Sequence, residues 1–365
     1  MDKDKLCEKL TEHLEVIKKC SIQTEQGTVL LATVLESRYP YVYPRDSSSA
    51  STLFRQMVEK GLDPNGDAFS ILKGLAKFIA YVQEESGRWG QRYGLNGQDK
   101  AIYIQEDNTA YGAIILANYL LTCYSRNEEP EELEVYITRI KKAIQYALKH
   151  FYREEIFLFF STTGIHESAI EKGYSIWVNH VYILFFNLIL QLTNKFNLKG
   201  LFDEELSFKC RFCQAVHRRF ILNDRFVRRI TKDGAFDLRP DVTLMSPVYF
   251  QCKEGHCDSC VLDENPEIID NSVNFMVENL WDSELGMLQR YLPFTEDIET
   301  HIHAGNGPWI QYTAMLAQYY YQTGAVERGD TILDQIDKYR TGEGHIPEHL
   351  STKRRFEEFI RLEWE

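Results

Sequence analysis

Residues 37–46, SRYPYVYPRD, are the most informative stretch of this sequence. Three tyrosines at alternate positions are followed by a proline and then by two adjacent, oppositely charged residues, Arg45 and Asp46. Alternating aromatic residues fit an extended segment, and a helix is expected to start in the serine run that follows. Aromatic faces stack on pyranose rings, and carboxylate and guanidinium groups bind hydroxyls by charge-assisted hydrogen bonds. The stretch therefore predicts a sugar-binding surface or, on the residues alone, an aromatic core strand with a local ion pair.

Composition limits the class of protein and of partner. The 365 residues allow one large domain or two average ones. Hydrophobic content of 44% and charged content of 26% are typical of soluble globular proteins, and we see no apolar run of bilayer-spanning length. Residues 1–20 lack the apolar core of a secretory signal, so a cytoplasmic location is expected. The net charge of −13 argues against nucleic acid or anionic membrane as the main partner and does not repel a neutral sugar.

Apolar periodicity predicts an all-α protein whose loops hold the informative residues. A strand is expected in 27–35, and the Lys-Asp-Gly turn signal predicts a small hairpin within 226–239. No Pro-rich or Ser-rich linker divides the sequence, so a single domain spanning 1–365 is the simplest interpretation. Helices are expected near 6–17, 47–60, 67–85, 108–125, 130–150, 168–196, 202–222, 264–279, 306–322, 326–339 and 351–364.

Further motifs follow the opening stretch in a fixed order along the chain. Together with it they resemble the blocks of glycoside hydrolase family 15, the glucoamylase-like enzymes. The motifs are GRWGQRY at 87–93 with Asn96-Gly97, QED at 105–107, Glu167 with Gly173, GMLQRY at 286–291, NGPW at 306–309 and IPEH at 346–349.

Four positions depart from the family's pattern. Tyr43 stands for the usual Trp of the first block, His166 for the Trp before the acidic residue, and His349 for a Gln. Gly307 is an extra residue in the Asn-Pro-Trp block. These departures bear on substrate preference more than on fold.

The resemblance implies a fold and a reaction. The fold is a six-hairpin α/α toroid with short β-hairpins in the loops, without a separate β-sandwich or starch-binding domain. The reaction is inverting, exo-acting hydrolysis that releases β-glucose from α-glucans, isomalto-type oligosaccharides or trehalose, and it requires no cofactor. Glu167 matches the general acid and Glu348 the general base, which inversion places roughly 6.5–9.5 Å apart to admit a water. On residue type alone either glutamate is a solvated surface group, and Glu171 competes with Glu167.

The resemblance also implies sugar contacts, and each has a structural alternative. Tryptophans at helix starts are often only packing residues, Arg290 also fits a bridge across a surface turn, and Asp107 also fits a helix cap. The expected substrate-binding residues are Tyr39, Tyr43, Arg45, Asp46, Trp89, Gln105, Asp107, Arg290 and Trp309.

Cysteines form two pairs with the spacing Cys-x-x-Cys. Cys210 with Cys213 and Cys257 with Cys260 could ligate a structural zinc ion, or join in a disulfide. They could equally be small hydrophobic residues on a helix and in a loop. Most thiols are expected to be reduced in a cytosolic chain.

Two other functions stay open. Sugar-binding residues can persist where chemistry is lost, which gives a non-catalytic glucan-binding or regulatory toroid as the main alternative. A phosphorylase on a similar toroid is weaker, because the basic run at 353–355 is the one candidate anion site near Glu348.

Overall fold

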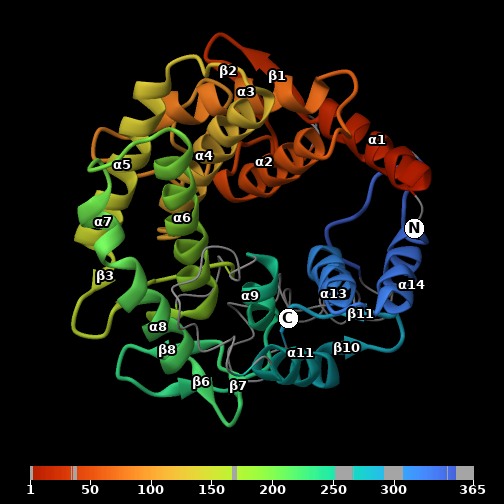
Figure 1. Cartoon of the computed structure of the whole chain (residues 1–365). Helices are drawn as coiled ribbons and strands as arrows, with labels where there is room; N and C mark the ends of the chain where they lie inside the picture. Colours follow the sequence, from red (N-terminus) through yellow and green to blue (C-terminus); the bar gives the residue numbers. More distant parts are fainter. Residues whose placement is uncertain are drawn as a thin grey trace. The chain divides into compact units, whose positions relative to one another are not determined.

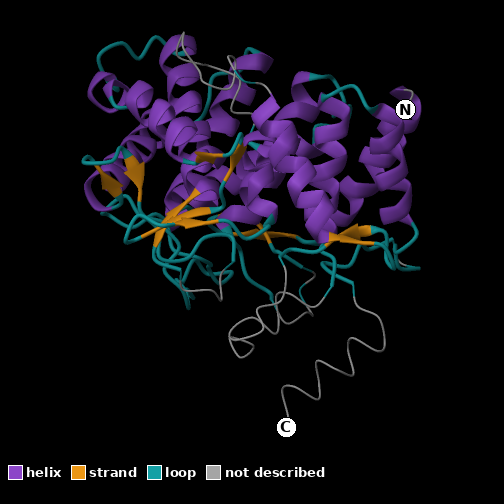
Figure 2. Ribbon diagram, turned by 90° about the horizontal axis from the view of Figure 1, so that it is seen from below, coloured by secondary structure: helices purple, strands orange, loops and turns teal. Residues whose placement is uncertain are grey.

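The structure is a computed structural model of the whole chain, and it is mostly helical with short strands (Figures 1 and 2). Inter-residue contacts divide the chain into two compact units. The first contains Met1–Phe159 and Val181–Arg211, and the second contains Phe160–His180 and Phe212–Glu365. The structure describes residues 3–33, 35, 39–166, 171–250, 265, 267–291, 307–342 and 344–350.

Helix α4 (Asn108–Arg126) is the centre of the first unit. Its sequence is apolar on every side, and residues 108–123 are all buried, as expected for a helix surrounded by others. It packs against α2, α3 and α5. The helices and strands of this unit are α1 (Lys3–Lys19), β1 (Ser21–Thr24), β2 (Gly27–Leu30), α2 (Pro44–Glu59), α3 (Asp67–Val82), α4, α5 (Leu133–His150), β3 (Tyr152–Arg153), β4 (Leu158–Phe159) and α7 (Asp203–Ser207).

Local sequence signals explain the ends of these helices. Pro44 is the first residue of α2, where a missing backbone N–H costs nothing. Asn127 ends α4 in the left-handed conformation, with φ of 55°, and its N–H bonds back to Cys123 and Tyr124. The predicted helices 47–60, 67–85, 108–125 and 130–150 are thereby confirmed to within a few residues. The strand expected in 27–35 ends earlier, at Leu30, where its antiparallel pairing with β1 ends.

The second unit combines short strands with helices. β5 (Gly173–Ser175), β8 (Arg229–Thr231) and β9 (Phe236–Asp237) form one antiparallel sheet in the order β5-β8-β9, so the hairpin predicted within 226–239 is confirmed. α13 (Ile310–Gln322) packs against α14 (Val326–Asp337) and α9 (Ser246–Tyr249). Its other elements are β6 (Ile221–Leu222), β7 (Arg225–Phe226), η1 (Val242–Met245), α11 (Glu267–Leu280), β10 (Trp281–Asp282) and β11 (Met287–Leu288).

Helix α6 (Ile176–Lys195) continues from one unit into the other and starts later than predicted. The prediction began at residue 168, but Gly173 has a φ of 150° in the strand pairing with β8. A Cβ at Gly173 would lie 2.4 Å from the carbonyl oxygen of Ile230, so only glycine allows this approach. By length and composition α6 could cross a membrane, but 78% of its apolar window is buried inside the protein, as in a core helix.

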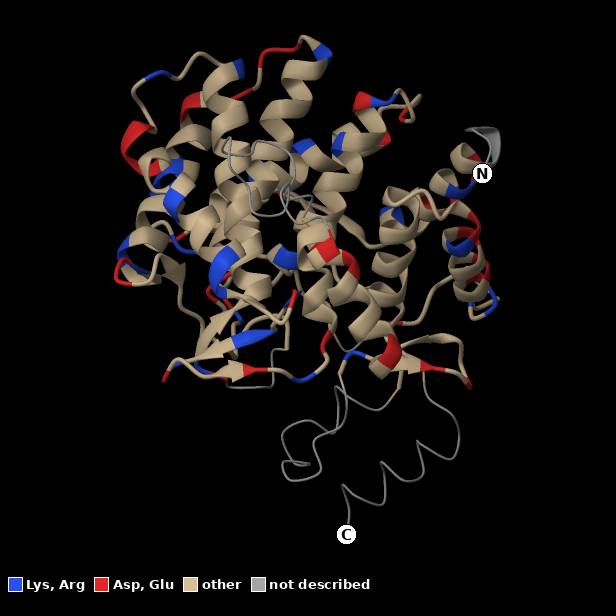
Figure 3. Ribbon diagram, turned by 60° about the horizontal axis from the view of Figure 1, so that its bottom comes forward, with Lys and Arg blue, Asp and Glu red and all other residues tan. Residues whose placement is uncertain are grey.

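The remaining helix predictions have mixed outcomes. The helix expected at 202–222 is two helices, α7 and α8 (Lys209–Arg219), separated at Phe208. Those expected at 264–279, 306–322 and 326–339 correspond to α11, α13 and α14. The helix expected at 351–364 lies outside the described residues. Acidic and basic residues are interspersed along the ribbon of both units (Figure 3).

Candidate functional site

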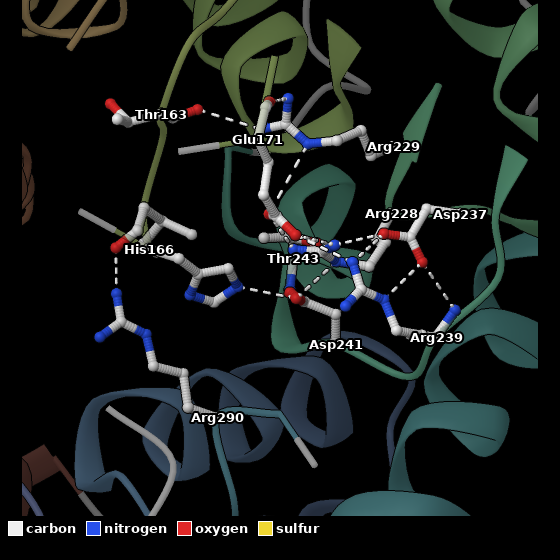
Figure 4. A network of polar contacts seen from close by, with 11 residues as sticks. Thr163, His166, Glu171, Arg228, Arg229, Asp237, Arg239, Asp241, Thr243 and Arg290 are labelled. Carbon is white, nitrogen blue, oxygen red and sulfur yellow. Dashed lines mark hydrogen bonds and ion pairs between the residues drawn. The ribbon is translucent and has the colours of Figure 1, made fainter. Parts of the chain in front are cut away.

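The second unit contains a buried cluster of charged side chains centred on Arg228 (Figure 4). Arg228 donates two hydrogen bonds to the carboxylate of Glu171, Nη1 to Oε1 at 2.9 Å and Nη2 to Oε2 at 2.6 Å. Its Nε donates to Oδ2 of Asp241 at 2.8 Å. A planar guanidinium can meet two carboxylates in this way because its N–H groups point in fixed directions.

The cluster contains further ion pairs and hydrogen bonds around Arg228. Asp237 accepts from both Arg228 and Arg239, and Arg239 also donates to Glu171 at 2.9 Å. Arg229 donates to the backbone oxygens of Glu171 and Thr163. The three arginines at 228, 229 and 239 balance the three acids at 171, 237 and 241, which makes burial of these charges tolerable.

These partners set the ionisation of the acids. Burial alone favours the neutral acid, but the contacts with Arg228 and Arg229 lower the pKa of Glu171 to about 2. Contacts with Arg239 and Arg228 likewise outweigh burial and lower the pKa of Asp237 to about 2. Glu171 is therefore ionised near neutral pH and cannot act as a general acid there. Its two hydrogen bonds from Arg228 fit a structural ion pair better than the general-acid role for which it competes with Glu167.

His166 is joined to the same cluster through Asp241. Its Nε2 lies 2.7 Å from Oδ2 of Asp241, and the side chain is buried. Burial lowers the pKa of His166, and the nearby charge of Arg290 adds to this effect, so that the value falls to about 4 although Asp241 opposes it. The imidazole of His166 is therefore uncharged at neutral pH.

Arg290 links the segment that ends at His166 to the segment that contains Glu348. Its Nη2 donates to the carbonyl oxygen of Ile165, and its guanidinium lies 4.6 Å from the centre of the Trp309 ring. Trp309 stacks on His349, with ring centroids 5.2 Å apart. The resulting series of contacts runs from Ile165 to His349 within one unit.

Glu348 lies next to the start of α13, in a segment that pairs with Trp309 through His349. Its backbone oxygen accepts a hydrogen bond from the N–H of Ile310 at 3.1 Å, while its side chain is exposed to solvent. Trp309 is about nine-tenths buried, and the side chains of Arg290 and His349 both pack against its ring. This differs from the open stacking platform that was expected. Glu167 lies outside the described residues.

The residues of the opening stretch lie in the first unit. Tyr39 is 50% exposed and Asp46 is also exposed, whereas Arg45 is half-buried. Tyr43 is buried, and its hydroxyl accepts a hydrogen bond from Arg92 at 3.1 Å. The exposed members of the stretch are accessible to a ligand, and Tyr43 is held by protein contacts.

Trp89 is placed in the core of the first unit, which corrects the expectation of a stacking platform. Its ring is fully buried, and its indole N–H donates to the carbonyl oxygen of Ile79 at 2.8 Å. It packs directly on α4 at Gly112, where a Cβ would come within 2.3 Å of the ring. Trp89 therefore stabilises the core, because protein atoms surround its ring.

Gln105 and Asp107 are buried at the start of α4. The side-chain oxygen of Gln105 accepts from Asn108 at 2.6 Å. Asp107 makes no side-chain capping hydrogen bond, and among the described residues neither of its carboxylate oxygens has a hydrogen-bond partner. Burial raises the pKa of Asp107 to about 6, although the charge of Arg45 opposes the change. The capping alternative is thus wrong for Asp107.

The structure describes only two of the four cysteines in the predicted pairs, Cys210 and Cys213. Cys210 is disulfide-bonded. The described ranges contain no cluster of metal-ligating side chains, and Cys257 and Cys260 lie outside those ranges. Zinc at the four cysteines stays a prediction: a chelator would lower the stability of a zinc protein, and a thiol reductant that of a disulfide-bonded one. The cytoplasmic location also stays a prediction, and disulfides are rare there.

Comparisons with known proteins identify the fold class. No known family profile matches the sequence, and no curated protein shows significant sequence similarity to it. Over 96% of its length the chain matches 90% of a glucoamylase from Saccharomycopsis fibuligera, with a TM-score of 0.72 and 13% identity. Over 99% it matches 92% of a glutamate-to-alanine variant of a glycosidase in complex with glucose, with a TM-score of 0.70 and 15% identity.

A third match has a different sugar specificity. Over 98% of its length the chain resembles 96% of a metal-independent α-mannosidase from Streptococcus pneumoniae, in a non-productive complex with α-1,6-mannobiose, with a TM-score of 0.67 and 12% identity. A D-mannose isomerase shares the fold as well. At this identity the matches establish the fold class predicted from the sequence, the glucoamylase-type α/α toroid. They leave membership of glycoside hydrolase family 15 a prediction.

Sequence reasoning missed the buried ionic cluster. The run of charges from Arg228 to Asp241 was assigned to a hairpin and a loop. One signal was available: Arg228 and Arg229 are adjacent where a strand begins, successive strand side chains point to opposite faces, and an arginine that faces the interior needs a partner there.

Proposed function

We propose that the protein is a glycoside hydrolase of the inverting, exo-acting α-glucosidase type, with Glu167 as general acid and Glu348 as general base. The observation that carries the proposal is the series of contacts through Arg290. It connects Ile165, two residues before Glu167, to Trp309 and His349, next to Glu348. Two glutamates 181 positions apart (348 − 167) thus belong to segments that share one arginine.

The exposure of Glu348 supports its role as the base. A general base in an inverting glycosidase must reach a water molecule, and an exposed side chain can do so. Glu171 is held by arginines and Asp241 is buried among His166 and Arg228, so neither offers a free carboxylate to a substrate. This leaves Glu348 as the carboxylate best suited to activate water in the described part of this region.

The proposed substrate is a small neutral α-linked carbohydrate. Matched proteins of the same fold were solved with glucose and with mannobiose, and the exposed Tyr39 and Asp46 have the chemistry to contact sugar rings and hydroxyls. Asp46 is the proposed hydroxyl contact of the sugar at the cleavage point. Asp46→Asn is then expected to lower kcat/KM, since a contact that tightens in the transition state is lost.

One observation favours the alternative of a non-catalytic glucan-binding toroid. Arg290 and His349 both lie against Trp309, so the stacking surface expected beside the leaving group is not open. A panel of α-linked disaccharides separates the two functions. Glucose release supports the hydrolase, whereas sugar binding without release supports the alternative.

The catalytic residues are tested by isosteric variants. Glu167→Gln and Glu348→Gln should each lower kcat by several orders of magnitude, because each removes one proton-transfer partner, with little change in thermal stability. Glu278→Gln, an exposed substitution on α11, is the matched control and should leave kcat unchanged. Near-normal turnover in either active-site variant would assign that role to another residue.

A further inference from the structure

The contact between His166 and Asp241 determines which imidazole nitrogen carries the proton. Asp241 accepts from Nε of Arg228 at 2.8 Å and, through Oδ1, from the N–H of Thr243 at 2.8 Å. Burial disfavours its charge, but the contacts with His166 and Arg228 hold the pKa of its carboxyl well below the usual range. An ionised carboxylate can only accept, so Nε2 of neutral His166 must carry the hydrogen.

The other imidazole nitrogen, Nδ1, is then a bare acceptor. It is buried and has no hydrogen-bond partner among the described residues. Tyr291 lies edge-on to the ring, with centroids 4.8 Å apart, and offers no bond to Nδ1. Leaving a buried acceptor without a donor is unfavourable, so such a group points to a binding partner.

His166 lines a small cavity of about 10 Å³ that also contacts Thr163, Glu171, Ser175 and Thr243. This volume is close to the minimum for one water-sized group. The Oγ1 of Thr243 is a second buried polar atom without a partner in the described part of the chain. Two of the residues that line this cavity, His166 and Thr243, thus each have a buried polar atom without a partner among the described residues.

The chemistry of the lining selects the occupant. Arg228 and Arg229 line the cavity and disfavour a cation, while Glu171 and the lone pair of Nδ1 disfavour an anion. A neutral hydroxyl can donate to Nδ1 and still accept from another group. The tryptophan that the resemblance would place at this position has a donor and no acceptor.

We propose that a neutral O–H group occupies this cavity and donates a hydrogen bond to Nδ1 of His166, with Asp241 as the positioning residue that fixes the tautomer. The oxygen belongs either to a sugar hydroxyl, in which case the inference rests on the proposed function, or to a water molecule. His166, the residue that precedes Glu167 in the sequence, then binds a hydroxyl group.

Nitrogen NMR of ¹⁵N-histidine-labelled protein tests the tautomer and the bond together. The resonances of His166 are assigned by their loss in His166→Gln. The expected spectrum at pH 7 has a protonated Nε2 and an unprotonated Nδ1 that is shifted by accepting a hydrogen bond. A further shift of Nδ1 on adding glucose identifies a sugar hydroxyl, and an unchanged shift identifies water. A protonated Nδ1, or one without the shift of a hydrogen-bond acceptor, overturns the proposal.

Two variants separate the nitrogens chemically. Gln can replace Nε2 as donor to Asp241 but removes the acceptor, whereas Asn retains a polar atom near Nδ1. For a sugar hydroxyl, His166→Gln should weaken glucose binding about tenfold, and His166→Asn should weaken it less. The exposed His150→Gln on α5 is the control and should bind as wild type.

Calorimetry of glucose binding and thermal melting on the same samples complete the test. Equal affinity in wild type and His166→Gln, together with a hydrogen-bonded Nδ1, assigns the oxygen to water and leaves the proposed function intact. Absence of sugar binding and hydrolysis in the wild type, across the disaccharide panel, overturns the proposed function and the sugar source together.

Discussion

Two buried acids in this protein, Glu171 in the second unit and Asp107 in the first, meet opposite environments. Glu171 is bound by Arg228 through two hydrogen bonds and has its pKa lowered to about 2. Asp107 is fully buried without a hydrogen-bond partner for its carboxylate among the described residues, and its pKa is raised to about 6. Burial pushes both values upward, so the bonded partner decides the outcome.

The difference bears directly on catalysis. A general acid near neutral pH needs an environment of the Asp107 kind, where its proton is retained. An acid that is bound by arginines, as Glu171 is, stays charged and serves a structural role. The proposed role of Glu167 therefore requires that it lie apart from the arginines that bind Glu171.

Removing Arg228 should have the largest effect on stability. Arg228→Met leaves Glu171 and Asp241 without their main cation, and loss of one partner of a buried ion pair costs about 3–5 kcal/mol of unfolding free energy. Urea denaturation at pH 7 measures this loss. Arg239→Met is the matched control, because Arg239 is 45% exposed and exposed pairs contribute about 0–1 kcal/mol. Equal losses in the two variants would contradict the assigned centre of the cluster.

Glu171→Gln should show an effect that depends on pH. The folded pKa of Glu171, about 2, lies below its ordinary value of 4.5, so its contribution is present above pH 4.5 and is lost as the pH falls towards 2. At pH 7 the variant should be less stable by about 3 kcal/mol. The gap between variant and wild type should close in denaturation series carried towards pH 2, and a gap that stays constant would disprove the lowered pKa.

Asp107→Asn should act in the opposite direction. The folded pKa of about 6 lies above the ordinary 3.8, so stability from the protonated acid is present below pH 3.8 and is lost as the pH rises through 6. The variant should therefore match wild type at pH 4 and exceed its stability by about 3 kcal/mol at pH 8. The exposed Asp203→Asn serves as control. Destabilisation by Asp107→Asn at pH 8 would mean that the carboxylate has an ionic partner.

The sequence predicted the helices of this protein better than its polar interactions. α4 could be predicted because its apolar run is long and Asn127 marks its end. The late start of α6 could not, because it depends on the pairing of Gly173 with Thr231, 58 positions away (231 − 173). A local pattern has no information on such a pairing.

The candidate site shows the same division. The resemblance named Arg290 and Trp309 as separate sugar contacts, whereas in the structure the Arg290 guanidinium lies against the Trp309 ring. It gave no indication of the bond between His166 and Asp241, which are 75 positions apart. Trp89 was misassigned because an aromatic residue in a loop motif looks the same whether it faces a ligand or, as here, the core of its unit.

The anomer of glucose that appears first tests the central claim most directly. If Glu348 activates a water molecule on the face of the sugar opposite to the acid, hydrolysis inverts the anomeric carbon. Proton NMR, recorded in the first minutes after wild-type protein is added to an α-linked disaccharide that it cleaves, should show β-glucose before mutarotation mixes the anomers. Initial accumulation of α-glucose would contradict both the inverting mechanism and the role of Glu348.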